Sequence, residues 1–272
     1  MSDRHSWPST AHMGMRQIRH QLNMFVRVPI AVFFTVALPI VVMLIFNAVF
    51  ADGDIVTNAG PWPVREFYSA AIAAFTAVSA TFTNLANMVP IRREEGVLQR
   101  WRVTPIPLGV LVVGYVGSAM VIAFVCTSIV VVIGWLAYGL TLSVAGAVSA
   151  ALTMMVATVS FAAMGMALAA LVPTASTASA AANAIILPLA MVSNVFIPVE
   201  QPPKWLDVSA NVLPLKPFIT AFQSAFHPTT TSVSFDVRAL LTIAAWGALA
   251  TVVAVTRFRW NVPPGGATRR RR

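Results

Sequence analysis

The stretch "PIAVFFTVALPIVVMLIFNAVF", from Pro29 to Phe50, decides the fold class because it runs for 22 residues without a charge. A helix rises about 1.5 Å per residue, so this run can cross a hydrocarbon core of about 30 Å. Pro39 lies inside the run, where a kink is expected. A cleaved signal peptide is disfavoured, because 28 residues precede the run and no clear A-x-A site follows it.

Five further apolar runs follow along the 272 residues, at 67–89, 108–138, 144–172, 178–197 and 239–256. The chain is 58% hydrophobic and 10% charged, with a mean hydropathy of +0.78. A soluble domain usually carries about a quarter charged residues. We therefore expect an all-α integral membrane protein with six transmembrane helices, built as a single domain over residues 1–272.

The positions of the charges predict the orientation. Residues 1–28, the connection between the second and third runs, and residues 257–272 hold four, four and six of the 18 basic residues. The positive-inside rule then places both termini in the cytoplasm, around a membrane domain at 29–256. The net charge of +9 thus reflects topology and attraction to membrane lipid rather than nucleic-acid binding. We expect a multi-pass protein of a bacterial cytoplasmic membrane.

Two segments outside the six runs have helical apolar patterns. Residues 13–27 place Met15, Ile18, Leu22 and Phe25 at helical spacing, which predicts an amphipathic helix on the cytoplasmic surface; a disordered basic leader is the alternative. Residues 198–237 contain a second apolar stripe, which predicts short outer helices that re-enter the membrane or cap a cavity. A plain interfacial helix remains the alternative for this segment.

Sequence motifs for catalysis are missing. There is no P-loop, no H-E-x-x-H and no G-x-S-x-G, so we expect a non-catalytic chain. The single cysteine excludes an internal disulfide, and the four scattered histidines predict neither a metal site nor a bound cofactor. The six runs contain no Asp, Glu, Lys, Arg or His in their interiors, which argues against a proton-driven carrier but leaves a channel or a carrier of a neutral solute open.

Neutral polar side chains recur on one face of two spans. On the second run the face carries Ser69, Thr76, Ser79, Thr83 and Asn87. On the fifth run it carries Ser176, Ser179, Asn183 and Asn194. Helix–helix contact is one explanation, because small polar residues are enriched there. The other is a weakly polar substrate pathway formed by Thr76, Ser79, Thr83, Asn87, Ser179, Asn183 and Asn194.

The charged stretch "IRREEGVLQRWRVTP", from Ile91 to Pro105, separates the second and third runs. Its arginines are explained by topology alone, but Glu94 and Glu95 weaken a purely positive signal. The stretch is compatible with a helix except at Gly96, and Pro105 ends it. A short charged helix held between two spans could contact a soluble partner.

This stretch resembles the cytoplasmic signature of exporter-type ABC transporter permeases, the ABC-2 type membrane subunits, in their daunorubicin-resistance-like branch. The matching residues are Glu95, Gly96, Arg100, Thr104 and Pro105. A second stretch, "LPLAMVSNVFIPVEQPPKWLDVSANVLPLKPFITAFQ", from Leu187 to Gln223, resembles the same family in its Ser-Asn-x-Phe-x-Pro and Pro-x-Trp-Leu elements. The segment "VLPLK" departs from the family's spacing, so its prolines are not assigned.

The resemblance implies a membrane subunit that exports an amphiphile, such as a drug, a lipid or a lipid-linked molecule. It implies two partners, a separate nucleotide-binding subunit that holds ATP and Mg, and a second permease copy, either identical or a paralogue. The implied ATPase-coupling helix comprises Arg92, Arg93, Glu94, Glu95, Gly96, Leu98, Arg100, Trp101, Thr104 and Pro105. The implied outer re-entrant region includes Phe196, Pro198, Pro203, Trp205, Phe218 and Phe222. An ATP-independent carrier or channel for a neutral solute, and a non-transporting scaffold, remain the alternatives.

Overall fold

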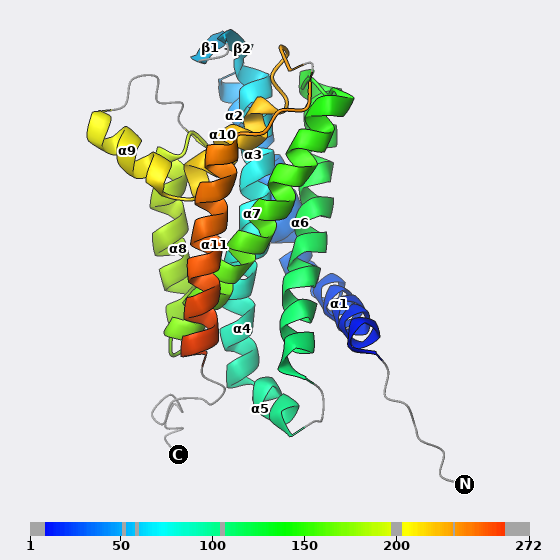
Figure 1. Ribbon diagram of the computed structural model, residues 1–272. Coiled ribbons are helices and arrows are strands. Elements are labelled where there is room, and N and C mark those ends of the chain that lie inside the picture. Colours follow the sequence, from blue (N-terminus) through cyan, green and yellow to red (C-terminus); the bar gives the residue numbers. More distant parts are fainter. Residues whose placement is uncertain are drawn as a thin grey trace, which may run out of the picture.

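The computed structural model describes residues 9–50, 53–57, 60–103, 107–196, 203–230 and 232–258. Within them the chain forms a bundle of long, roughly parallel helices with short elements at both ends (Figure 1). Six helical segments are long and apolar enough to cross a membrane, which confirms the predicted fold class. They are α2 (Pro29–Val49), the continuous α3 (Val64–Val78), η1 (Ser79–Thr83) and α4 (Asn84–Glu94), then α6 (Leu108–Tyr138), α7 (Val144–Leu171), α8 (Ala175–Val192) and α11 (Val237–Arg257).

The second span, α3–η1–α4, is the core of the bundle. In its most apolar window 78% of the residues are buried, against 6% for α2 and 22% each for α8 and α11. Alanines make this packing possible, because Ala70, Ala71, Ala73, Ala74 and Ala77 are at most 1% exposed and let neighbouring helices approach closely. Helix α3 packs mainly on α6, and α7 packs along α11. The sparsely buried α2 and α8 therefore form the open side of the described fold.

Helix α1 (Thr10–Val26) confirms the predicted helix before the first span, and its place on the membrane surface stays a prediction. It packs against α6, where Gly14, Gln17 and Gln21 are buried, whereas Met15 is 67% exposed. The reason is steric: a Cβ at Gly117 of α6 would lie 2.6 Å from Ile18, so α6 admits the α1 side chains only because it carries glycine there. The apolar pattern could not show which partner surface had this groove.

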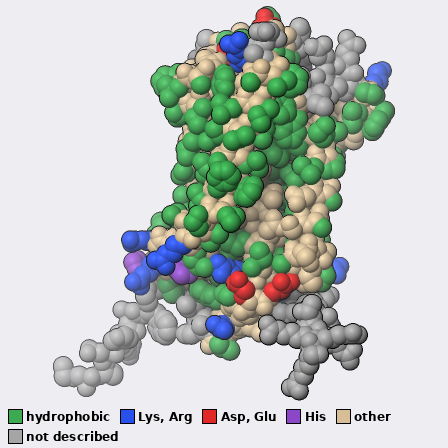
Figure 2. Space-filling model, turned by 180° about the vertical axis from the view of Figure 1, so that it is seen from behind, with side chains coloured by type: hydrophobic (Ala, Val, Ile, Leu, Met, Phe, Trp, Pro, Cys, Tyr) green, Lys and Arg blue, Asp and Glu red, His purple; other side chains and the backbone are tan. Residues whose placement is uncertain are grey.

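Helices α1 and α5 (Val97–Arg102) and the C-terminal end of α11 lie at one end of the bundle, which we call the basic end (Figure 1). Figure 2 shows an apolar band between the two ends of the molecule, with Lys, Arg and His side chains gathered over α1. Among the described residues, Asp, Glu, Lys and Arg lie on the short elements, in the connections or at the ends of the six spans, and none lies in the middle of a span. This distribution matches a helical bundle whose middle faces hydrocarbon.

The opposite end carries a β-hairpin that the sequence analysis did not predict, formed by β1 (Asp54–Thr57) and β2 (Gly60–Pro63). Trp62 anchors it, since its ring is 2% exposed and packs edge-on against Phe67 and against His227. Glu66 ties the hairpin to the α6–α7 connection, because its Oε2 accepts hydrogen bonds from Trp62 Nε1 at 3.3 Å and from Thr141 Oγ1 at 3.1 Å.

Two short helices, α9 (Lys204–Val212) and α10 (Leu215–Ser224), follow α8 at this end. Helix α10 packs against α3, α7 and α11, and its aromatic stripe explains why: Phe218 and Phe222 are 0% and 2% exposed. Helix α9 projects from the bundle beside α8 (Figure 1). The predicted stripe therefore corresponds to a helix inserted between the ends of three spans.

Candidate functional site

The second span is interrupted at its middle by the π-helix η1, from Ser79 to Thr83. Such interruptions are rare and occur frequently at functional sites. Two contacts stabilise it: Asn87 Nδ2 donates to the Thr83 carbonyl at 2.8 Å, and Gly165 of α7 lies so close that a Cβ there would be 2.6 Å from the Phe82 carbonyl oxygen. The second and fourth spans therefore approach each other closely at Gly165.

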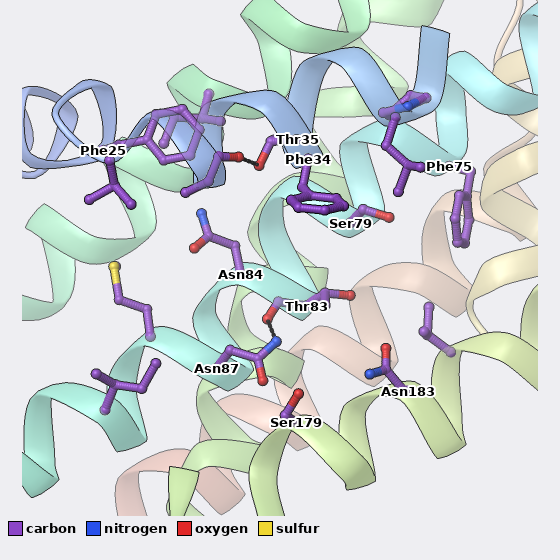
Figure 3. Close-up of a pocket in the computed structure, with 18 of the residues that line it drawn as sticks. Phe25, Phe34, Thr35, Phe75, Ser79, Thr83, Asn84, Asn87, Ser179 and Asn183 are labelled. Atoms are coloured by element: carbon purple, nitrogen blue, oxygen red, sulfur yellow. Dashed lines mark hydrogen bonds between the residues drawn. The ribbon is translucent and has the colours of Figure 1, made fainter. Parts of the chain in front are cut away.

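A cavity of about 1040 Å³ lies beside this π-helix (Figure 3). Its walls come from α1, α2, the second span, α6 and α8, together with Phe196. Most of the lining is apolar, with aromatic rings from Phe25, Phe34 and Phe75. The cavity is large enough for a ligand of drug or lipid size, and its mixed lining suits an amphiphile.

Five of the seven residues predicted for a pathway line this cavity: Ser79, Thr83 and Asn87 from the second span, and Ser179 and Asn183 from α8. Figure 3 shows the two sets on facing helices. Ser179 and Asn183 are exposed on α8, so their hydroxyl and amide groups are open to the cavity. Two spans far apart in sequence thus bring neutral polar groups to one space, as the two stripes indicated; their transport role stays a prediction.

The other two predicted pathway residues do not line the cavity. Thr76 is 1% exposed, and its hydroxyl donates to the Ile72 carbonyl at 2.7 Å inside its own helix. Asn194 lies beyond the end of α8 with a backbone φ of 58°, the left-handed conformation that asparagine tolerates. Ser69 is also buried and accepts from Asn47 Nδ2 at 3.2 Å. For Thr76 and Ser69 the helix-packing explanation describes the structure better.

Sequence reasoning missed the contribution of α1 and α2 to the cavity wall. Gln21 of α1 and Thr35 of α2 line it together with Asn84 of the second span. Thr35 donates its hydroxyl to Ala31 O at 2.7 Å, so it presents mainly its methyl group. Asn84 lies one residue outside the stripe that regular helical spacing selects, and only the π-helix turns it toward the cavity.

Charged groups lie at the end of the cavity nearest the basic end. Arg92 Nη1 and Glu95 Oε2 form an ion pair at 3.0 Å, and both residues line the cavity. The Arg92 side chain is 22% exposed and that of Glu95 is 49% exposed, so solvent screens the pair and its contribution to stability is small, about 0–1 kcal/mol. Its importance lies in position, because it places one charge of each sign in the lining of an otherwise mostly apolar cavity.

The predicted coupling segment forms a sharp joint followed by the short helix α5. Gly96 has a φ of 72°, a left-handed conformation that glycine adopts without a steric cost. Leu98 is 0% exposed and, with Trp101, packs into a cluster from α4, α6 and α7. Arg100 is exposed. The helix is thus anchored on one side and open on the other; Thr104 and Pro105 lie outside the described residues.

Two charged residues of the predicted coupling segment make contacts within the chain. Arg93 is 3% exposed and points into the bundle, where its guanidinium donates to backbone carbonyls after α7. Glu94 Oε1 accepts from the Ala175 N–H at 2.7 Å. These two charges are therefore engaged within the chain, because they lie on the side of α4 that faces the α7–α8 connection.

The predicted outer region contains both buried and exposed residues. The centroid of the Phe196 ring lies 5.7 Å from that of Phe46 and 5.5 Å from that of Phe75, and Phe196 lines the cavity. Pro203 precedes α9, and Trp205 is 72% exposed on it. Phe218 and Phe222 are buried, as described above. Pro198 lies outside the described residues.

A six-span helical membrane protein with a cavity of this size beside an interrupted central span has the architecture of a transporter's membrane domain. A family profile described as ABC-2 type transporter matches residues 15–227, so the chain belongs to this family. It is therefore a non-catalytic, membrane-spanning component of an ABC transporter. No curated protein matches the sequence.

Proposed function

We propose that this chain is the membrane subunit of an exporter that moves an amphiphilic drug, lipid or lipid-linked molecule, driven by a separate ATPase. The observation that carries the proposal is the cavity beside η1, lined by residues of both α2 and α8, in a member of the ABC-2 family. An apolar lining with Ser79, Thr83, Asn87, Ser179 and Asn183 along it would accept a chain or ring system and bind a few polar groups.

The proposed ATPase partner would contact α5. Leu98 fixes this helix to the bundle, while Arg100 and the 86% exposed Val103 face outward at the basic end. The positive-inside rule places that end in the cytoplasm, where ATP and Mg are available on the nucleotide-binding subunit. A short helix that is anchored to the bundle on one side and exposed on the other can transmit a displacement, because its anchored side cannot move separately from the bundle.

The test is to search the neighbouring genes for a P-loop ATPase, co-express the chain with the candidate subunit, co-purify the complex and measure ATP-dependent efflux from vesicles. Gly96→Val should leave membrane insertion intact but reduce coupled transport, because a β-branched residue is strained at a φ of 72°. The control is Gly109→Ala, where an added Cβ meets nothing within 4 Å. Equal efflux in the two variants contradicts the coupling assignment, and cargo movement without any ATPase supports the carrier or channel instead.

A second permease copy, identical or a paralogue, would cover the open side formed by α2 and α8. Helix α8 leaves Ser179 and Asn183 exposed, and an amide that faces hydrocarbon without a partner is costly. Ala180 and Ala184, also exposed, give the same helix the small-residue spacing typical of close helix contacts. The cavity would then lie between two chains.

Single cysteines test this arrangement in a Cys126→Ala background, since Cys126 is the only native thiol. Ala184→Cys on α8 should give a cross-linked species that contains two permease chains when a short bifunctional reagent is added. Val125→Cys, which is 54% exposed on α6, is the matched control and should stay uncross-linked. Cross-linking only through Val125→Cys would show that the two permease chains meet at α6, which contradicts the proposed contact at α8.

A further inference from the structure

Arg93 and Glu94 are adjacent residues at the end of α4 that contact opposite ends of two successive helices. Arg93 Nη1 donates to Ala169 O at 3.2 Å, and Nη2 donates to Val172 O at 2.6 Å and Pro173 O at 2.9 Å. Glu94 Oε1 accepts from the first N–H of α8, that of Ala175, at 2.7 Å. All these contacts join residues 76 to 81 positions apart in the chain.

The signs of the two charges fit the two helix ends. The last carbonyls of a helix lack partners within it and carry partial negative charge, which the cationic Arg93 matches at the end of α7. The first N–H groups of a helix carry partial positive charge, which Glu94 matches at the start of α8. Exchanging the two residues would place each charge at the unfavourable end.

The Arg93 contacts are also strong, because the side chain is 3% exposed and a buried guanidinium requires acceptors. Charge-assisted hydrogen bonds are shorter and about twice as strong as neutral ones. The connection from Val172 to Thr174 is only three residues long, and Thr174 caps α8 by accepting from Thr177 N at 3.2 Å. A short, capped turn held at both ends has little freedom to move separately from α4.

We propose that Arg93 and Glu94 are positioning residues that make the α7–α8 connection move together with the α4–α5 joint. Gly96 lies two residues after Glu94 and immediately precedes α5, and Ser179 of the cavity wall lies about one helical turn after Ala175. A displacement of α5 is therefore passed to the α8 wall without a second contact to the ATPase. This inference rests on the proposed function, because the displacement comes from the partner ATPase.

The experiment follows the reactivity of Asn183→Cys on α8 with a membrane-impermeant maleimide, in the Cys126→Ala background and in the complex with the co-purified ATPase. With native Arg93 and Glu94, adding a non-hydrolysable ATP analogue should change the labelling rate by about fivefold or more, the usual lower size of a coupling between sites. In Arg93→Met and Glu94→Ala the ratio should fall to about one, while the ATPase still co-purifies and hydrolyses ATP.

Conservative variants separate positioning from folding. Glu94→Gln keeps an acceptor oxygen for Ala175 N and should retain the nucleotide effect, whereas Glu94→Ala should lose it. Arg93→Lys keeps the charge but cannot span the Ala169 and Val172 carbonyls together, and should retain part of it. Arg257→Met is the control, an exposed arginine at the same end of the bundle. If Arg93→Met fails to assemble, the Glu94 variants test the inference instead, because the Glu94 side chain is exposed and its replacement should not prevent folding.

The outcomes are distinct. A nucleotide effect in Arg93→Met or Glu94→Ala that equals the effect in Arg257→Met overturns the inference and leaves the proposed function standing. An unaltered chain that neither co-purifies with the ATPase nor shows a nucleotide effect overturns both. A loss confined to the Arg93 and Glu94 variants, with recovery in Glu94→Gln, supports the inference.

Discussion

Gly165 gives the sharpest test of how the π-helix is held in place. A Cβ added at Gly165 would lie 2.6 Å from Phe82 O, 3.2 Å from Phe82 Cα and 3.2 Å from Leu85 Cβ. Two of these atoms belong to the backbone of the second span, so no side-chain rotation relieves the contact. Overpacking of this kind costs about 1–3 kcal/mol. Replacing a helical glycine by alanine otherwise favours the helix by about 0.8–1 kcal/mol.

Gly165→Ala should therefore destabilise the protein by about 0–2 kcal/mol, the difference between these two effects. For a domain of this size each kcal/mol lowers Tm by about 2–4 °C, which thermal unfolding in detergent can detect. Gly109→Ala on α6 is the matched control, because an added Cβ there meets nothing within 4 Å and Tm should stay equal or rise slightly. A Tm for Gly165→Ala at or above that of Gly109→Ala refutes the argument that close approach at Phe82 requires glycine.

Three further predictions concern the cavity, the coupling helix and the outer helices. In a Cys126→Ala background, Thr83→Cys should react with a soluble thiol reagent while Thr76→Cys should not, because only Thr83 lines the cavity; equal labelling contradicts the assigned wall. Leu98→Ala should lower stability by about 2–5 kcal/mol and loosen α5, whereas the exposed Val103→Ala should leave Tm unchanged; thermal unfolding of both variants decides. The hydrogen bond from Lys216 Nζ, at 2.7 Å, lowers the pKa of Asp207 below its usual 3.8, so the α9–α10 bridge should persist at neutral pH and weaken only as the pH falls below about 3.8. Hydrogen exchange of α9 that increases already near pH 6 speaks against this bridge.

The sequence predicted the six spans within a few residues, because long uncharged runs have few alternatives in a membrane protein. The β-hairpin escaped notice because its strands are four residues each and one contains two prolines. The buried face of α1 could not be predicted either, since it depends on glycines of α6 such as Gly117. Local patterns show which residues can be buried, but contacts between distant segments decide which are.

The same limit applies to Arg93 and Glu94. Their sequence neighbours make them members of a charged cytoplasmic connection, and charge counting treats all four arginines of that connection alike. Only the position of the α7–α8 turn beside α4 distinguishes the buried Arg93 from the exposed Arg100. A signal was nevertheless present: the pair Glu94 and Glu95 beside Arg93 is poorly explained by topology, since acidic residues contribute little to it.

The polar stripe of the second span shows how one irregular turn changes what a periodic pattern means. Successive residues of an α-helix turn by about 100°, and on that basis Ser69, Thr76, Ser79, Thr83 and Asn87 share a face. A π-turn adds one residue to its hydrogen-bonded ring, so the face after it is rotated relative to the face before it. The stripe changes from buried to cavity-lining at Ser79, the first residue of η1. The interruption therefore allows one continuous span to pack tightly on α6 through its first half and to open a polar wall through its second, and the Asn87 amide satisfies the carbonyl of Thr83 at the end of the turn.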